Sequence, residues 1–355
     1  MRTCMISSVL ILVVASVCGA AASDSLEERL ARAGDPAQVG ETVESDAARR
    51  AAYIALEALC AMVRETGEEA RLEHTARLVT ALHDPLPTMR RAAARVLVVR
   101  PDVDTVPVLL DALDRESSVP VRRVLVNCVA DALKRLDLPD HDPQLVAAAS
   151  AFEGTIRDST TDAEVRSAAM AGLGRLGPVA MPALLRFAQD SRWGSAFHSQ
   201  LPAAFAATGD PAAVDEILAL YDGDPAEGFR AGCLHALMTL LKETQPDDPV
   251  TAQRAADALR TIALHTPNAS LAAVASRAYS CVDGCHADIE FVTFVRTHVA
   301  TSQGRARKNY LRALLGLGLP LDAQTKTAVE SIRDSATASA AERKVANAIL
   351  LNDTE

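Results

Sequence analysis

Residues 162–190 read DAEVRSAAMAGLGRLGPVAMPALLRFAQD, and this stretch decides the fold. Asp162 stands where a side chain accepts hydrogen bonds from the free N–H groups of a helix start, and Glu164 lies near the positive end of the helix dipole. Apolar residues follow at helical spacing up to a Leu-Gly turn, and Gly177 and Pro178 then open a second helix. The stretch therefore predicts two α-helices joined by a short turn.

The opening phrase of this pair, an Asp or Pro turn followed by a basic residue and an Ala-rich helix, returns along most of the chain. Its basic residues include Arg90, Arg122, Arg166 and Arg230. They recur with a period of about 32 to 44 residues, and the last gap equals two such steps. A period of this length is typical of paired-helix repeats, which bury their apolar faces only by stacking on their neighbours. The sequence therefore predicts an all-α superhelix.

At these residues the chain resembles the HEAT-repeat family, in particular the bacterial HEAT-like repeats of the phycobilin-lyase type. The resemblance covers roughly residues 45 to 351 and implies a HEAT-like solenoid of about eight helix pairs with a C-terminal capping helix. It also implies that the first helices form the outer, convex layer and the second helices line the concave face. The pairs are expected near 45–82, 87–115, 119–158, 162–190, 194–221, 225–265, 268–302 and 304–336, and the last helix at Ala340 to Leu351.

The basic residue of the phrase is predicted to have a structural role. In the decisive stretch, Val165 is expected to point into the helix pair and Arg166 to reach an Asp or a carbonyl of the adjacent turn. Small residues such as Ala168, Ala169 and Gly172 would let neighbouring helices approach closely. The repeated arginines are therefore expected to stabilise the stack.

The N-terminus predicts export. Arg2 precedes an apolar run, residues 9–15, that is too short for an ordinary transmembrane helix, and residues 20–23 (AAAS) suit cleavage. We expect a secreted or periplasmic protein without membrane insertion after cleavage. The expected parts are a signal peptide at 1–22, a short helix and flexible lead-in at 23–44, the repeat solenoid at 45–351 and a tail at 352–355.

Cys18 raises the alternative of a lipoprotein. Lipidation needs a small residue directly before the cysteine and a Leu-like residue three positions before it. Val17 and Ala15 occupy these positions, so the sequence favours a soluble exported protein.

The composition limits the partners. Hydrophobic residues make up 49% of the chain and aromatic residues only 3%, which suits helices packed through Ala, Leu and Val. The formal net charge is −10, and an acidic surface repels phosphate backbones and anionic lipids. We therefore expect a protein or peptide partner and no nucleic acid.

The sequence carries little sign of catalysis. The sequence has no His-Glu-x-x-His, Gly-x-Ser-x-Gly, P-loop or Gly-x-Gly-x-x-Gly motif, so no catalytic residue, metal or cofactor is expected. The loop Asp140-His141-Asp142 contains metal-ligand types, but Asp142 is better explained as a helix cap before Pro143.

The cysteines give the most specific local signal. Cys281 and Cys285 flank Gly284 at a helix end, and in an exported protein they predict a disulfide, although so short a loop restricts its geometry. The stretch through His286 also resembles c-type haem attachment, but three residues separate its cysteines instead of two. Three other cysteines fall on apolar stripes of first helices and are predicted to be buried thiols: Cys60, Cys128 and Cys233.

Aromatic residues concentrate in the middle of the array. Arg192, Trp193, Phe197 and His198 lie in or near a first helix that lacks the Val-Arg phrase, and such departures often mark binding surfaces. Because Trp and Arg are enriched at interface hot spots, these four residues form the predicted partner-binding site. The alternative is that the rings fill a wider gap between helices. Half of the aromatic residues fall here: Phe187, Trp193, Phe197, Phe205, Tyr221 and Phe229.

The basic cluster at 305–308 (RARK) has two interpretations. Nucleic-acid binding is one, and the opening of a repeat, as Arg90-Arg91 opens an earlier one, is the other and is favoured.

These observations predict an exported, non-catalytic scaffold that binds a protein or peptide partner on a solenoid surface. The alternative is an enzyme or enzyme-accessory subunit built on HEAT-like repeats, either lyase-like or a redox/haem-partner module. Export and the acidic surface disfavour DNA as its substrate.

Overall fold

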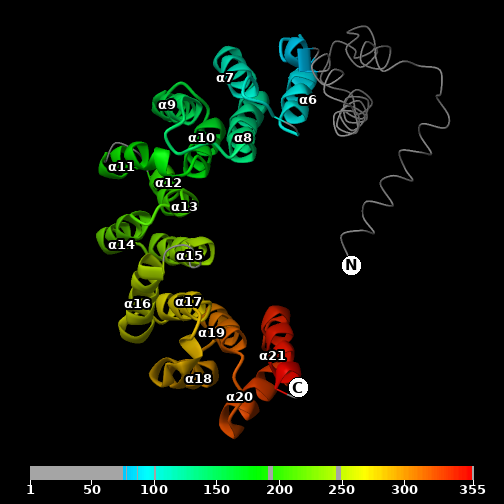
Figure 1. Cartoon of the computed structure of the whole chain (residues 1–355). Helices are drawn as coiled ribbons and strands as arrows, with labels where there is room; N and C mark the ends of the chain where they lie inside the picture. Colours follow the sequence, from blue (N-terminus) through cyan, green and yellow to red (C-terminus); the bar gives the residue numbers. More distant parts are fainter. Residues whose placement is uncertain are drawn as a thin grey trace, which may run out of the picture. The chain divides into compact units, whose positions relative to one another are not determined.

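The computed structural model describes residues 75–353, except 77, 86, 100, 191–194 and 245–248. Within these residues the chain is all-α, with α-helices α6 to α21, two short 3-10 turns and no strand (Figure 1). The predicted signal peptide, the lead-in, most of the first repeat pair and the last two residues of the tail lie outside the described residues and stay predictions.

The helices follow the expected pairs from residue 87 onward. The first helices are α6 (Pro87–Leu97), α8 (Val119–Leu136), α10 (Ala163–Arg175), α12 with α13 (Ser195–His198 and Leu201–Ala207), α15 (Glu227–Thr244), α17 (Ala269–Tyr279) and α19 (Gly304–Leu317). The second helices are α7 (Thr105–Arg115), α9 (Pro143–Arg157), α11 (Met181–Gln189), α14 (Ala213–Gly223), α16 (Pro249–His265), α18 (Ile289–Thr301) and α20 (Ala323–Asp334). The final helix is α21 (Ala340–Asn352), and the 3-10 turns are η1 (Pro178–Ala180) and η2 (Cys285–Ala287). The predicted all-α repeat fold is thereby confirmed.

Polar caps start the helices where the sequence places them. Asp162 accepts a hydrogen bond from the Glu164 N–H at 2.7 Å, and Asp142 accepts one from the Gln144 N–H at 2.8 Å. Ser339 forms a full capping box at the start of α21. Each cap satisfies backbone donors that have no partner inside the helix, so helix starts are fixed locally.

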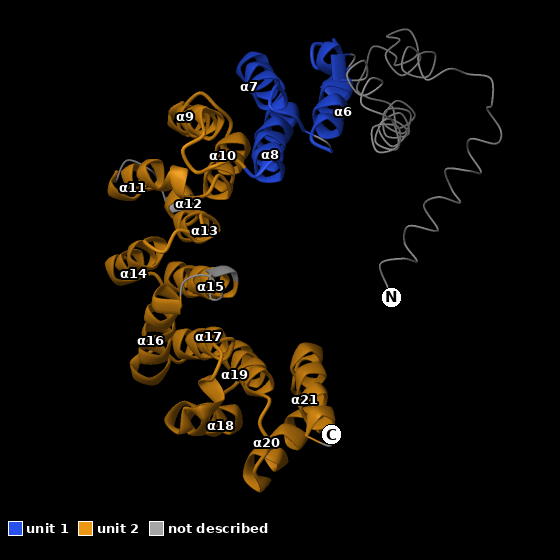
Figure 2. Cartoon of the chain, in the orientation of Figure 1, with its two compact units in different colours: residues 1–137 blue, residues 138–355 orange. Residues whose placement is uncertain are grey.

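The contacts divide the chain into two compact units, Met1–Asp137 and Leu138–Glu355 (Figure 2). The boundary falls in the polar connector that follows α8, where Asp137 has a left-handed backbone with φ 49°. We call Leu138–Glu355 unit 2.

Unit 2 has two layers of helices. The first helices α10, α13, α15, α17, α19 and α21 each pack closely on the next, while the second helices touch one another over fewer residues. Figure 2 places the first helices on the inner side of the bend within this unit. The family resemblance implied the opposite assignment, which is therefore wrong for these pairs.

Close approach between first helices explains this arrangement. A Cβ added at Gly174 of α10 would lie 2.5 Å from the Ala204 carbonyl oxygen of α13, and one at Gly316 of α19 would lie 2.9 Å from Ser280 Oγ. Only glycine fits at such distances, so the small residues bring the first helices nearer together than the second helices. A stack with one closer layer bends toward that layer.

The core is built as the composition predicts, from Leu, Ala and Val with a few buried rings. Phe187 and Phe205, two rings of the mid-array group, are 1% and 0% exposed, as the space-filling alternative predicts for them. No helix among the described residues combines the length and apolar character needed to cross a bilayer.

Three of the repeated arginines, Arg90, Arg166 and Arg230, have the structural role predicted for them. Arg166 Nε donates to the Ile156 carbonyl at 2.9 Å, and Arg230 Nε donates to the carbonyls of Tyr221 and Asp224 at 3.0 and 2.8 Å. In the first unit, Arg90 donates to the Asp84 and Pro85 carbonyls and pairs with Glu116. These guanidinium groups tie the starts of α6, α10 and α15 to the chain segment just before each of them.

Candidate functional site

The predicted mid-array binding residues are only partly described. Arg192 and Trp193 lie outside the described residues. Phe197 in α12 is half-buried, and the Arg166 guanidinium carbon lies 4.3 Å from its ring centroid. Because Arg166 also binds the preceding turn, Phe197 packs against a structural side chain.

His198 also contacts its own chain. Its ring stacks on Phe229 with a centroid separation of 4.6 Å and an interplanar angle of 12°, and its Nδ1 lies 3.7 Å from Asp224 Oδ2. The structure thus joins Phe197 and His198 to neighbouring repeats. Their role in binding stays a prediction.

The predicted disulfide is absent in this structure, where Cys281 and Cys285 are free thiols. Cys281 is exposed and its Sγ lies 3.6 Å from the Arg277 carbonyl, whereas η2 carries Cys285 into the interior, 3.6 Å from the Ser280 carbonyl. Burial, and then proximity to Cys281, raises the pKa of the Cys285 thiol. The two thiols therefore occupy different environments. Of the other cysteines, Cys128 and Cys233 are buried as expected, and Cys60 lies outside the described residues.

The acidic loop before α9 is accounted for by capping, as predicted, because Asp142 accepts from the Gln144 N–H. Among residues that the structure describes, no group of three or more His, Cys, Asp or Glu side chains is arranged to hold a metal ion.

A groove of about 440 Å³ crosses the first helices α15, α17 and α19 of unit 2. We call it the first-layer groove. Small residues of α15, including Gly228 and Gly232, line one side. Its polar lining includes His235 on α15, Ser270 and Arg277 on α17, and Lys308, Asn309 and Arg312 on α19.

Three cations of the groove have no ion-pair or hydrogen-bond partner for their side chains among the described residues. Arg277, Lys308 and Arg312 are all half-buried. Burial, followed by repulsion from Arg312, lowers the pKa of the Arg277 guanidinium. The charged neighbour of the Arg277 guanidinium is therefore another cation, Arg312. This is notable because the chain as a whole carries a formal net charge of −10.

One acidic residue lies at the groove edge. Hydrogen bonds from Ser270 and then Asn268, with a further contribution from Arg305, lower the pKa of Glu227. Asn268 Nδ2 lies 3.2 Å from Glu227 Oε2. The Glu227 carboxylate therefore interacts with groups at the groove edge. It forms no ion pair with Arg277, Lys308 or Arg312.

The basic cluster at 305–308 divides between two roles. Arg307 Nε binds Glu342 Oε1 of the α21 capping box at 3.0 Å, in agreement with the repeat interpretation. Arg305 and Lys308 line the groove instead. The cluster thus places Arg307 against the neighbouring helix and places Arg305 and Lys308 in the groove lining.

Three groove residues, Arg277, Asn309 and Arg312, were not predicted from the sequence as site residues. Lys308 and Arg312 are four residues apart, so they share one helix face. This spacing could have predicted a pair of cations on that face. Arg277 comes from another helix, and its position beside Arg312 depends on how α17 and α19 pack.

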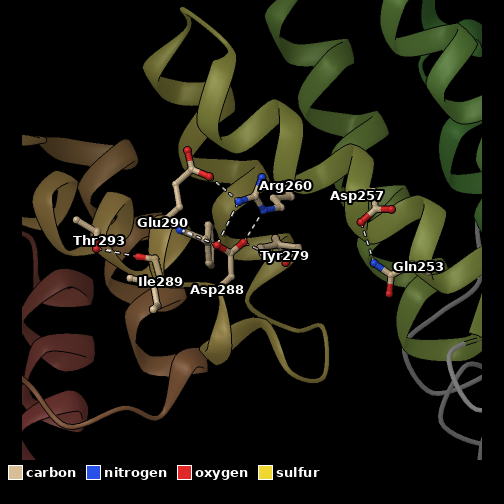
Figure 3. A network of polar contacts seen from close by, with 9 residues as sticks. Gln253, Asp257, Arg260, Tyr279, Asp288, Ile289, Glu290 and Thr293 are labelled. Atoms are coloured by element: carbon tan, nitrogen blue, oxygen red, sulfur yellow. Dashed lines mark hydrogen bonds and ion pairs between the residues drawn. The ribbon is translucent and has the colours of Figure 1, made fainter.

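In the second layer, by contrast, an arginine is paired with carboxylates. Arg260 of α16 reaches the start of α18, where its Nε lies 2.5 Å from Asp288 Oδ2 and its Nη2 lies 2.6 Å from Glu290 Oε2 (Figure 3). Asp288 also caps α18 through the Phe291 N–H and accepts from the Tyr279 hydroxyl at 3.4 Å. The Arg260 hydrogen bond outweighs the opposing effect of burial and lowers the pKa of Asp288.

No family model matches the sequence, and no curated protein matches it. Among solved structures, the CpcE–CpcF complex of phycocyanin lyase from Nostoc sp. PCC7120 is 19% identical, with 78% of this chain and 94% of that chain covered and a TM-score of 0.38. An engineered protein is 17% identical, with 94% and 99% covered and a TM-score of 0.36.

The karyopherin Kap121p, bound to the extreme C-terminus of the protein phosphatase Cdc14p, is 13% identical and has a TM-score of 0.45. The match covers 99% of this chain and 45% of Kap121p, so the chain spans a little under half of that protein. Similarities at this level assign neither a family nor a function.

Proposed function

We propose that this protein is an exported, non-catalytic scaffold that binds a protein or peptide partner on the first-helix layer of unit 2. One observation carries the proposal: the first-layer groove holds half-buried cations that its own chain does not neutralise. Charge left unpaired on a concave surface favours a partner of opposite charge. Stacked helix pairs present such extended surfaces to their partners.

Partner capture tests this function. The full chain with a C-terminal tag is expressed in its native host, cross-linked in intact cells and purified, and the captured proteins are identified by mass spectrometry. We expect a partner that is absent from capture with an unrelated exported protein carrying the same tag. Recovery of nothing beyond that control would contradict the scaffold role.

Export has a separate test. The exported protein is expected to begin near Ser23, because the small residues at 20–23 suit cleavage. It is expected to carry no lipid on Cys18, because Val17 and Ala15 do not match the residues that lipidation needs. N-terminal sequencing and intact mass measure both features. A chain that retains Met1, or an acylated Cys18, contradicts this part of the proposal.

Trp193 tests the mid-array surface. If it anchors the partner, Trp193→Ala should weaken binding by about 2 kcal/mol or more and leave folding intact. If its ring fills the interior, the same change should destabilise the fold by roughly 3–5 kcal/mol. Trp193 is the single tryptophan of the chain, so its emission and acrylamide quenching report on it directly. Blue-shifted emission that resists quenching contradicts the anchor role.

The alternative, an enzyme or accessory subunit of the lyase-like or redox/haem-partner kind, has one observation in its favour. Cys281 is an exposed free thiol, and His286 is also exposed nearby in the sequence. Haem titration with the wild type and with Cys281→Ser distinguishes this role. A haem absorption change that the serine variant abolishes would favour the alternative over the scaffold.

A further inference from the structure

We propose that the first-layer groove binds an acidic peptide segment, whose carboxylates pair with Arg277, Lys308 and Arg312. The inference rests on the proposed scaffold function and names the chemistry of the partner. Nothing in the sequence motifs or in the similar structures assigns a ligand to this groove.

The cations of the groove converge from two helices. Lys308 and Arg312 lie one turn apart on one face of α19, and Arg277 of α17 is close enough to Arg312 to be affected by its charge. Asn309, which is 8% exposed, lies beside them with an amide that can donate and accept hydrogen bonds. The groove therefore offers three positive charges and a polar amide to one ligand.

These charges contrast with three other half-buried arginines of the chain. Arg90 pairs with Glu116, Arg260 pairs with Asp288, and Arg230 binds two carbonyls. Holding Arg277 next to Arg312 without an acid opposes folding, since like charges repel and burial removes water. A bound carboxylate removes both costs, and a guanidinium can bind it through two parallel hydrogen bonds.

The shape favours a peptide chain. The volume of about 440 Å³ falls within the roughly 300–1,000 Å³ typical of ligand pockets. Gly228, Ala231 and Gly232 of α15 leave room for a backbone on one side, and Ser270 and Asn309 supply polar groups for its amides. Because the cations span only this groove in a chain of net charge −10, the long phosphate track of a nucleic acid is disfavoured.

Fluorescence anisotropy with the full exported chain tests the inference. The probe is a labelled hexaglutamate peptide at low salt, and hexaglutamine, inorganic phosphate and a single-stranded oligothymidylate are unlabelled competitors. The groove variant is Lys308→Gln with Arg312→Gln. Its matched control, Arg135→Gln with Lys344→Gln, removes the same charge at exposed side chains outside the groove.

We expect hexaglutamate to bind the wild type and the control alike, and the groove variant to bind at least about tenfold more weakly, since two charge-assisted contacts are lost. Arg277→Gln should weaken binding similarly from a different helix, and circular dichroism should show that all variants fold. Hexaglutamine should not compete.

Three results would overturn the inference. Hexaglutamate that binds no better than hexaglutamine shows that the groove takes no acidic peptide. Equal losses in the variant and the control show a response to net charge alone. Competition by phosphate or oligothymidylate at lower concentration than unlabelled hexaglutamate identifies a phosphate site instead.

Partner capture separates this inference from the proposed function. A partner captured equally by the wild type and the groove variant leaves the scaffold role intact and places its binding elsewhere, which overturns the groove as its site. Hexaglutamate binding without any captured partner supports the groove chemistry and counts against the scaffold role.

Discussion

Arg260 and Arg277 both lie in unit 2, on helices α16 and α17 that follow one another in the chain, yet the fold treats them differently. Arg260, in the second layer, binds Asp288 and Glu290 at the start of α18. Arg277, in the first layer, lines the groove beside Arg312, and no carboxylate among the described residues pairs with it. Burial and a like charge lower the pKa of Arg277, while hydrogen bonds to two carboxylates raise that of Arg260.

The difference teaches how to separate structural from functional arginines in a repeat protein. A guanidinium whose hydrogen bonds end on its own chain stabilises the stack, and its removal should cost stability. A half-buried guanidinium without acceptors destabilises the free protein, and its removal should cost only ligand binding. Removing the paired arginine of the second layer should therefore lower stability and leave ligand affinity unchanged. Removing an unpaired arginine of the first layer should lower ligand affinity and leave stability unchanged.

The largest effect is expected at the paired arginine. Arg260→Gln leaves Asp288, whose side chain is 14% exposed, without its cation, so we expect unfolding to become easier by about 2 kcal/mol. Urea denaturation measures the change. Arg333→Gln is the control, since both side chains of the Arg333–Asp334 pair are largely exposed and its loss should not be detectable. Equal stability of the Arg260 variant and the wild type would show that the network contributes nothing.

The next effect is a pH dependence at the same contact. Hydrogen bonding to Arg260 lowers the pKa of Asp288, so its contribution is fully present above the unfolded value of about 3.9 and is lost as pH falls through the lower folded pKa. The stability difference between wild type and Asp288→Asn should be constant from pH 5 to 7 and shrink below about pH 4. A difference that grows on acidification would mean that the folded pKa is raised instead.

A smaller loss is expected at a repeat arginine. Arg230 donates to the carbonyls of Tyr221 and Asp224, and Arg230→Gln should destabilise the protein by about 1 kcal/mol, the usual net value of such hydrogen bonds. Arg230→Lys keeps the positive charge but lacks the forked N–H donors of the guanidinium, so it should recover little of the lost stability. Full recovery by lysine would show that charge, not geometry, matters here.

Much of the fold could be predicted because its signals are local. Asp162, Asp142 and Ser339 cap helices through backbone donors within three residues, so their roles follow from the sequence alone. The role of Arg166 follows from the repeat, which places the same turn before each first helix. The helix pairs from 87 onward were predictable for the same reason.

The candidate site depends on packing between repeats, which the sequence did not reveal. Arg277 meets Arg312 only because α17 and α19 approach closely, and Gly316 against Ser280 is part of that approach. The same packing puts the first helices on the inner side of unit 2, against the expectation from family resemblance. The different environments of Cys281 and Cys285 also depend on packing, since η2 buries Cys285 and leaves Cys281 exposed.

The smallest effect, and the sharpest for the comparison, is expected at Arg312. Because Arg312 repels Arg277 and binds no acid among the described residues, Arg312→Gln should leave the free energy of unfolding unchanged or raise it by up to about 0.5 kcal/mol. Any gain should fade at 1 M salt, since screening there acts within about 3 Å. A clear loss of stability would place Arg312 with Arg260 among the structural arginines. Arg312 would then not be available to bind a ligand in the groove.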